Sequence, residues 1–247
     1  MKILHTSDWH LGHTLYNYDR SQEQEDFLRQ LAEIVRHEKP DVMTVSGDIY
    51  HYSTPSAATQ KMYTEGLLNI HKACPEMAIV VTAGNHDSSS KLEIDSSLWQ
   101  HFGVTVIGNI ERDCENVNLA RHIIAIENGK GEKKGYVIAV PHIYPQNFPV
   151  LDAGTPREER QPRFFQALLD ETEKQNTERL PVVLMAHLSI TGSDRSGHDE
   201  SIGGIDYVPL EDLGKGYDYL ALGHIHCPQD IKGSSRRARY CGTPLPV

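Results

Sequence analysis

No stretch of about 18 consecutive apolar residues occurs in the 247-residue chain, so the sequence predicts no transmembrane helix. The first residues, MKILHTSDWH, also lack the apolar segment of a secretory signal peptide. We therefore expect a cytoplasmic protein that does not associate with a membrane.

Cysteine is scarce, and the four positions, Cys74, Cys114, Cys227 and Cys241, form no CxxC pair. Isolated cysteines in a chain of this length are typical of reduced thiols rather than of a disulfide framework. Cys227 follows His226 directly, which leaves two interpretations open, a zinc ligand or a small apolar filler. We favour the filler, because free cysteine usually behaves as a small hydrophobic residue.

Basic residues are fewer than acidic ones, 24 against 34, and the formal net charge is −10. Because general nucleic-acid binders usually carry a basic face, the charge taken alone argues against that class. It does not exclude a metal-dependent enzyme acting on DNA, since bound divalent cations supply local positive charge. Histidine is abundant, with 14 residues, and the positions of the histidines are more informative than their number.

Apolar runs and helical periodicity predict an α/β protein. Strands are expected over 2–7, 41–46, 78–83 and 104–108, and helices over 21–37, from Thr54-Pro55 onward and over 88–102. This alternation implies parallel βαβ units. Segments 119–126 and 136–140 flank a glycine-rich hairpin signal, an exposed helix is expected over 160–175, and two further strands end at His187 and His224. A second or mixed sheet is therefore expected.

Polar residues follow five of the predicted strands at the point where each strand ends. The five segments are Asp8-Trp9-His10, Gly47-Asp48, Gly84-Asn85-His86-Asp87, His187 and Gly223-His224-Ile225-His226. Ligands of open α/β sheets bind at the carboxyl ends of the strands, so these side chains are expected to converge. Each segment alone has a simpler explanation as a helix cap or a turn. Five such segments in order are hard to explain in that way.

The residue types in these segments are those of a metal site. In an extended backbone, the spacing of Asp8 and His10, and of His224 and His226, puts both side chains of a pair on one side. Carboxylate, amide and imidazole ligands together suit Mn, Fe or Zn. The ligands suffice for two ions, and a carboxylate at a tight turn, such as Asp48, is able to bridge them. Two such ions can generate a hydroxide nucleophile and stabilise a phosphoryl-transfer transition state.

In order, the motifs D-x-H, G-D-x-x-[DH], G-N-H-D, H and G-H-x-H resemble those of the calcineurin-like metallophosphoesterase superfamily over nearly the whole chain. The resemblance implies a single domain over 1–247, folded as a four-layer α-β-β-α sandwich of two mixed sheets flanked by helices. It also implies two divalent metal ions. The first would be bound by Asp8, His10, Asp48 and His226, and the second by Asp48, Asn85, His187 and His224. His86 would contact the scissile phosphate or protonate the leaving oxygen, and Asp87 would orient His86.

The segments HTSDWHLG, SIGGIDYVPLEDLGKGYDYLALGHIH and RYCGTPLPV are similar to the SbcD family, the nuclease subunits of bacterial SbcC–SbcD complexes. This narrower resemblance implies a Mn²⁺-dependent 3′–5′ exonuclease on duplex ends and an endonuclease on single strands and hairpins. It would act in DNA repair, recombination and replication at the nucleoid, with an SbcC-type ATPase and as a homodimer. The family's capping and C-terminal ATPase-binding regions are not visible, so we expect a truncated chain.

His51 stands where many phosphatases of the superfamily carry the last aspartate of GDxxD. The resemblance to SbcD implies that His51 positions the DNA backbone and is not a metal ligand. The simpler alternative is a hydrogen-bonded loop histidine. Two other functions also stay open: a phosphatase or small-molecule phosphodiesterase using the same site, and a DNA-end scaffold without catalysis. The chain lacks the Arg-Gly of the phosphatase motif GDxVDRG, and every ligand position is filled, so we favour the nuclease.

Overall fold

The computed structural model describes residues 1–247 apart from 114–115, 195–206 and 235–236. Cys114 and part of the SIGGIDYVPLEDL segment lie outside the described residues. The other three cysteines, Cys74, Cys227 and Cys241, are free thiols. No helix in the described part of the chain is both long and apolar enough to span a membrane.

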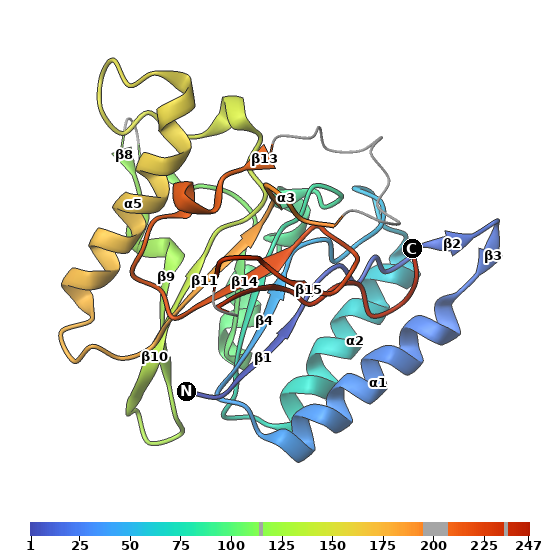
Figure 1. Cartoon of the computed structure of the whole chain (residues 1–247). Coiled ribbons are helices and arrows are strands. Elements are labelled where there is room, and N and C mark those ends of the chain that lie inside the picture. Colours follow the sequence, from blue (N-terminus) through green and yellow to red (C-terminus); the bar gives the residue numbers. More distant parts are fainter. Residues whose placement is uncertain (114–115, 195–206, 235–236) are drawn as a thin grey trace.

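The first half of the chain forms a parallel sheet with two helices on its outer face (Figure 1). Its strand order is β1 (Ile3–Thr6), β4 (Val42–Ser46), β5 (Ala78–Thr82) and β6 (Val104–Ile107). Helices α1 (Ser21–Glu38) and α2 (Ala57–Ala73) pack on the outer side chains of these strands, such as Met43 and Val45. Repeated βα units leave all four carboxyl ends at one edge of the sheet.

The second half forms a mixed six-stranded sheet. Its order is β15 (Gln229–Asp230), β16 (Ala238–Tyr240), β14 (Tyr219–Gly223), β11 (Val182–His187), β10 (Lys133–Ala139) and β9 (Ile123–Glu127). Strands β9 and β10 form the expected antiparallel hairpin. Strands β10, β11, β14 and β16 run parallel to one another. Helix α5 (Arg157–Gln175) covers the outer face of this sheet through side chains that include Phe164, Phe165 and Leu168.

The two sheets pack face to face through alternating side chains. Val42, Val80, Val183 and Met185 fill the space between the sheets and are almost completely buried. Neighbouring residues on the same strands, such as Leu184, point outward toward the helices. The result is the predicted α-β-β-α sandwich, although the first sheet is wholly parallel among the described residues rather than mixed.

Shorter elements connect these layers. They are β2 (Thr14–Leu15), β3 (Tyr18–Asp19), β7 (Arg112–Asp113), β8 (Asn116–Val117), β12 (Ser189–Ile190), β13 (Tyr207–Val208), α3 (Ser89–Leu92) and α4 (Ser96–Trp99). Single 3₁₀ turns lie at Gln100–Phe102, Leu119–His122, Pro145–Asn147 and Leu210–Leu213.

Three predicted helices differ from the structure. Helix α2 begins at Ala57 rather than at Pro55, because the Ser56 hydroxyl accepts a hydrogen bond from the Thr59 N–H and caps the helix. The segment 88–102 forms two short helices and a 3₁₀ turn, and the Glu93 carboxylate between them binds the backbone at 108–109. Helix α5 was predicted to be exposed, but one of its faces is buried against the second sheet.

The two sheets approach each other closely at the end of β14. A Cβ atom at Gly223 would lie 1.8 Å from the Ser46 carbonyl oxygen and 2.8 Å from His187 Nδ1. The Ser46 hydroxyl donates a hydrogen bond to the Ala221 carbonyl oxygen at 3.0 Å, which joins β4 to β14. The absence of a side chain at Gly223 therefore sets how closely the carboxyl ends of the two sheets approach.

We expect Gly223→Ala to lower the free energy of unfolding by about 3 kcal/mol or more, because the added methyl meets backbone that cannot move aside. Urea unfolding monitored by circular dichroism measures the change. Gly131→Ala is the control: Gly131 has a positive φ of 76° and no atom within 4 Å of an added Cβ, so only a conformational cost of about 1–2 kcal/mol is expected. Equal losses in the two variants would contradict the steric explanation.

Candidate metal centre

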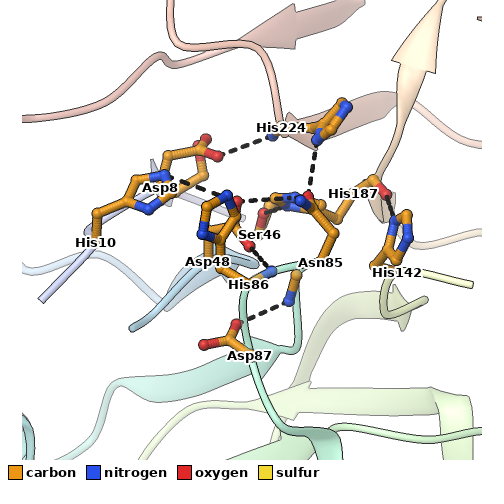
Figure 2. Close-up of polar contacts among 12 residues, drawn as sticks. Asp8, His10, Ser46, Asp48, Asn85, His86, Asp87, His142, His187 and His224 are labelled. Atoms are coloured by element: carbon orange, nitrogen blue, oxygen red, sulfur yellow. Dashed lines mark hydrogen bonds and ion pairs between the residues drawn. The ribbon is translucent and has the colours of Figure 1, made fainter. Parts of the chain in front are cut away.

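Two loops that follow β1 and β4 continue side by side beyond the first sheet. The N–H groups of Asp8, His10 and Leu11 donate hydrogen bonds to the carbonyl oxygens of Gly47, Asp48 and Ile49, at 2.9–3.0 Å. The His51 N–H returns a hydrogen bond to the Leu11 carbonyl oxygen at 3.0 Å. These bonds fix the first two predicted ligand segments relative to each other. Figure 2 shows how the segments after β5, β11 and β14 meet them.

The first cluster consists of Asp8, His10 and His226, whose ligand atoms all lie within 4.8 Å of one another. His10 Nε2 and His226 Nε2 are 3.1 Å apart. Asp8 and His10 are buried, and His226 is half-buried. A carboxylate and two imidazole nitrogens that converge in this way form a set of donors suitable for a transition metal.

The second cluster consists of Asp48, His187 and His224, also within 4.8 Å of one another and all buried. Asn85 joins them, because its Oδ1 lies 2.9 Å from both His187 Nε2 and His224 Nδ1. Figure 2 shows the Asn85 side chain directed toward both rings. This arrangement adds an amide oxygen to a carboxylate and two imidazoles.

Asp48 lies between the two clusters. Its Oδ2 is 3.3 Å from His187 Nε2 and 3.7 Å from His10 Nε2, so one oxygen atom faces a histidine of each cluster. Its Oδ1 accepts a hydrogen bond from the His86 N–H at 2.9 Å. The buried His/Asp clusters on either side of Asp48 thus indicate a site for two metal ions.

His187 is held with one nitrogen facing the site. Its Nδ1 is 2.8 Å from the Ser46 carbonyl oxygen, which only accepts hydrogen bonds, so Nδ1 carries a proton. Burial favours the neutral ring, but the Asp48 carboxylate opposes burial and raises the pKa of His187 to about 9. At neutral pH, Nε2 therefore carries a proton that a metal ion would have to displace in order to bind.

The buried carboxylates respond to each other as well as to the histidines. Burial raises the pKa of Asp8 to about 7. The nearby His187 lowers this pKa, and the negative charge of Asp48 raises it. Burial also works against the charge of Asp48, but His187 and His10 outweigh it and hold the pKa of Asp48 well below its usual range. Burial keeps the pKa of His10 well below its usual value. At neutral pH the site thus combines the buried, charged carboxylate of Asp48 with the neutral imidazole of His10.

Four of these residues have a left-handed backbone. The φ angles are 53° at Asp8, 46° at His10, 51° at Asp48 and 97° at His224. Such conformations are uncommon for residues other than glycine, cost on the order of 1–3 kcal/mol each and gather at functional sites. All four side chains belong to the two clusters.

His86 and His51 lie at the open side of the first cluster. His86 Nδ1 is 2.8 Å from the His51 carbonyl oxygen, so Nδ1 donates this bond and Nε2 stays available. The His86 ring is perpendicular to the His10 ring at 4.8 Å between centroids. Burial, and then His13 and His86, lower the pKa of His51 to about 4, so His51 is neutral at neutral pH.

The Asp87 carboxylate contacts backbone groups of two loops. It accepts hydrogen bonds from the N–H groups of Ile49, Tyr50 and Gly84, at 2.8–3.1 Å. The partner of the His86 ring is the His51 carbonyl oxygen. Asp87 therefore ties the loop after β5 to the loop after β4. That Asp87 orients His86 stays a prediction.

His142 also lies at the site, although it was not among the predicted residues. Its Nδ1 is 3.2 Å from the His187 carbonyl oxygen, and its ring stacks on His224 at 6.3 Å with an interplanar angle of 25°. His142 follows Pro141 just after the end of β10. Like the five predicted ligand segments, His142 lies just after the end of a strand. The same pattern could therefore have identified His142 as a residue of the site.

Comparisons with known proteins agree with this geometry. The chain is 34% identical over its whole length to the SbcD subunit of the nuclease SbcCD from Rhodobacter capsulatus, covering 62% of that protein. It is 30% identical to the corresponding protein from Escherichia coli K12 over 100% of the chain and 61% of the relative, and 30% identical to that from Bacillus subtilis over 99% and 62%. The chain thus spans about three fifths of the length of these relatives.

The calcineurin-like phosphoesterase family matches residues 1–228, which include all five strand-end segments and both clusters. A match over most of its length shows that the chain belongs to the calcineurin-like phosphoesterase family.

Proposed function

We propose that the chain is the nuclease part of an SbcD-type enzyme that hydrolyses phosphodiester bonds in DNA. The observation that carries this proposal is the pair of buried ligand clusters joined through Asp48 Oδ2, with His86 beside them. The likeness to the SbcD subunits of SbcCD nucleases over the whole chain supports DNA as the substrate class. Residues 1–247 would form one nuclease domain.

Each ligand is proposed from its place in the clusters. Asp8, His10 and His226 would bind one ion, and Asn85, His187 and His224 the other, with Asp48 shared. The mixture of imidazole nitrogen with carboxylate and amide oxygen suits Mn²⁺ better than Mg²⁺. When bound, two such ions supply an activated water and neutralise charge that develops on the phosphate.

The set His10, His51 and His86 also has ligand atoms within 4.8 Å, but it contains no carboxylate. His10 is already proposed as a ligand of the first ion, so we do not assign a further metal to this set. His51 and His86 are left to act on the substrate. A neutral His51 would position the DNA backbone, and His86 would hold the phosphate or move a proton at Nε2 to the leaving 3′-oxygen.

Further properties of the SbcD-type relatives belong to the same proposal. These are 3′–5′ exonuclease activity on duplex ends and endonuclease activity on single strands and hairpins, in DNA repair, recombination and replication. An SbcC-type ATPase partner, a homodimer and a place at the cytoplasmic nucleoid follow by the same analogy. With a net charge of −10, this chain would rely on its metal ions and its partner to hold DNA.

Metal binding is expected to release protons. Because the pKa of His187 is about 9, its Nε2 carries a proton at pH 7.5 that a metal ion must displace. The apparent affinity for Mn²⁺ should therefore rise with pH up to about 9, by about tenfold per pH unit for one linked proton. Titration calorimetry in buffers of different ionisation enthalpy measures the number released. His187→Gln should lower that number, and His37→Gln, at an exposed histidine, should leave it unchanged.

DNA cleavage tests the function directly. End-labelled linear duplex should be degraded with Mn²⁺ and not with chelator, and His86→Ala should slow cleavage about 10²–10⁴-fold while Mn²⁺ still binds. Asp48→Asn, which keeps the shape of the side chain but removes the shared charge, should lose both cleavage and the second Mn²⁺. Undiminished cleavage by Asp48→Asn would contradict the two-metal site.

The phosphatase alternative predicts a different result. It requires fast hydrolysis of a small phosphomonoester such as p-nitrophenyl phosphate, with no cleavage of DNA or of bis-p-nitrophenyl phosphate. The small diester matters because its hydrolysis needs the metal clusters but no extended DNA-binding surface. The phosphatase proposal would replace the nuclease proposal under two conditions. The monoester would have to be hydrolysed, and DNA would have to stay intact with the chain alone and with an SbcC-type partner added.

A further inference from the structure

A cleft of about 330 Å³ opens beside the second cluster. Its walls include Asn85, Asn109, Ile110, Ile143, Tyr144 and Asn147. Of these, only Asn85 belongs to the ligand segments, and the rest come from the segments that follow β6 and β10. The volume lies at the lower end of the range typical of small-molecule sites.

We propose that this cleft is a nucleoside subsite, in which the base and sugar next to the scissile phosphate lie against Tyr144. The proposal rests on the proposed function, because it places the substrate's phosphate at the two clusters. It adds a substrate contact outside the metal-binding segments and a residue that would recognise a base.

The charges around the cleft favour the uncharged part of a nucleotide. Among the residues that the structure describes, no lysine or arginine lines it. Of its polar side chains, the Asp87 carboxylate is engaged by three backbone N–H groups, and His142 Nδ1 donates to the His187 carbonyl oxygen. The described walls thus offer a phosphate no cationic side chain, whereas a base would find amide and aromatic groups.

Tyr144 is linked to the candidate metal centre through His142. Its ring lies 4.7 Å from that of His142, at an interplanar angle of 86°. His142 is fixed in turn, since its N–H donates to the Ala83 carbonyl oxygen at 2.8 Å and its side chain contacts His187. Tyr144 keeps 39% of its surface exposed, which leaves ring surface for a base to contact. His142 thus links Tyr144 to the second cluster.

The part of the wall that follows β6 is also fixed by hydrogen bonds. Glu93 Oε1 accepts hydrogen bonds from the N–H groups of Gly108 and Asn109, at 2.7 and 3.1 Å. The same carboxylate forms an ion pair with Arg121 at 2.7 Å. Because Asn109 Nδ2 donates to Glu93 Oε2 at 3.3 Å, its carbonyl oxygen points away from Glu93. The Asn109 carbonyl oxygen is thus not engaged by Glu93, and Asn109 lines the cleft.

Binding of a nucleotide and of its abasic counterpart tests the subsite. The probes are thymidine 5′-monophosphate and the same phosphate carrying a tetrahydrofuran in place of thymidine, each titrated with Mn²⁺ present. Stacking on one aromatic ring predicts that wild type binds the thymidine compound roughly fivefold or more tightly than the abasic one. Tyr144→Ala should abolish this preference, and Tyr144→Phe should retain it.

Tyr16→Ala is the matched control, because Tyr16 is 95% exposed and does not line the cleft. It should keep the preference for the base. Thermal unfolding checks that Tyr144→Ala is folded, and the comparison of the two probes on wild type needs no variant at all. Equal binding of both probes by wild type, or a preference that survives in Tyr144→Ala, would overturn the subsite.

Failure of the proposed function would look different. A chain that prefers the thymidine compound through Tyr144 but cleaves neither DNA nor bis-p-nitrophenyl phosphate would keep the subsite and lose the nuclease. A chain that cleaves DNA with Mn²⁺ but binds both probes equally would keep the nuclease and lose the subsite.

Discussion

The position of the Asp48 carboxylate is the constraint on which the rest of the site depends. It is buried, its backbone is left-handed, and its two oxygens face three different segments of the chain. One oxygen accepts the His86 N–H, and the other faces His10 and His187. A buried carboxylate is stable as an anion only if positive or hydrogen-bonding groups surround it. The histidines thus stabilise Asp48, and Asp48 brings histidines from both sheets together.

The sandwich explains why those histidines can meet. His10 follows a strand of the parallel sheet, whereas His187 and His224 follow strands of the mixed sheet. The close approach at Gly223 brings the carboxyl ends of the two sheets to the same edge, where the Ser46 carbonyl oxygen binds the His187 ring. Packing between the sheets therefore determines the distance between ligands that are far apart in the sequence. Because each cluster combines residues from both sheets, a shift of the sheets would pull apart the residues within each cluster.

The fold class and the convergence of the ligand segments were predictable, because both follow from local patterns. Apolar runs marked the strands, and each ligand lies within a few residues of a strand end. The role of Asp87 was not predictable, because the three N–H groups that it accepts from belong to segments 84 and 49–50, which only the fold brings together. The burial of one face of α5 was missed for the same reason, since its many charges concealed the row formed by Phe164, Phe165 and Leu168.

The cleft beside Asn85 illustrates a more general limit of prediction from motifs. Metal ligands are confined to a few residue types, so their positions stand out in a sequence. A wall that contacts an uncharged base needs only an aromatic face and amide groups at the right distance, and such residues are common in any loop. Here Tyr144 becomes informative only through His142, which ties it to the His187 and His224 rings. In the proposed subsite, contact with a base would thus be carried by residues whose significance appears only once the fold places them beside the candidate metal centre.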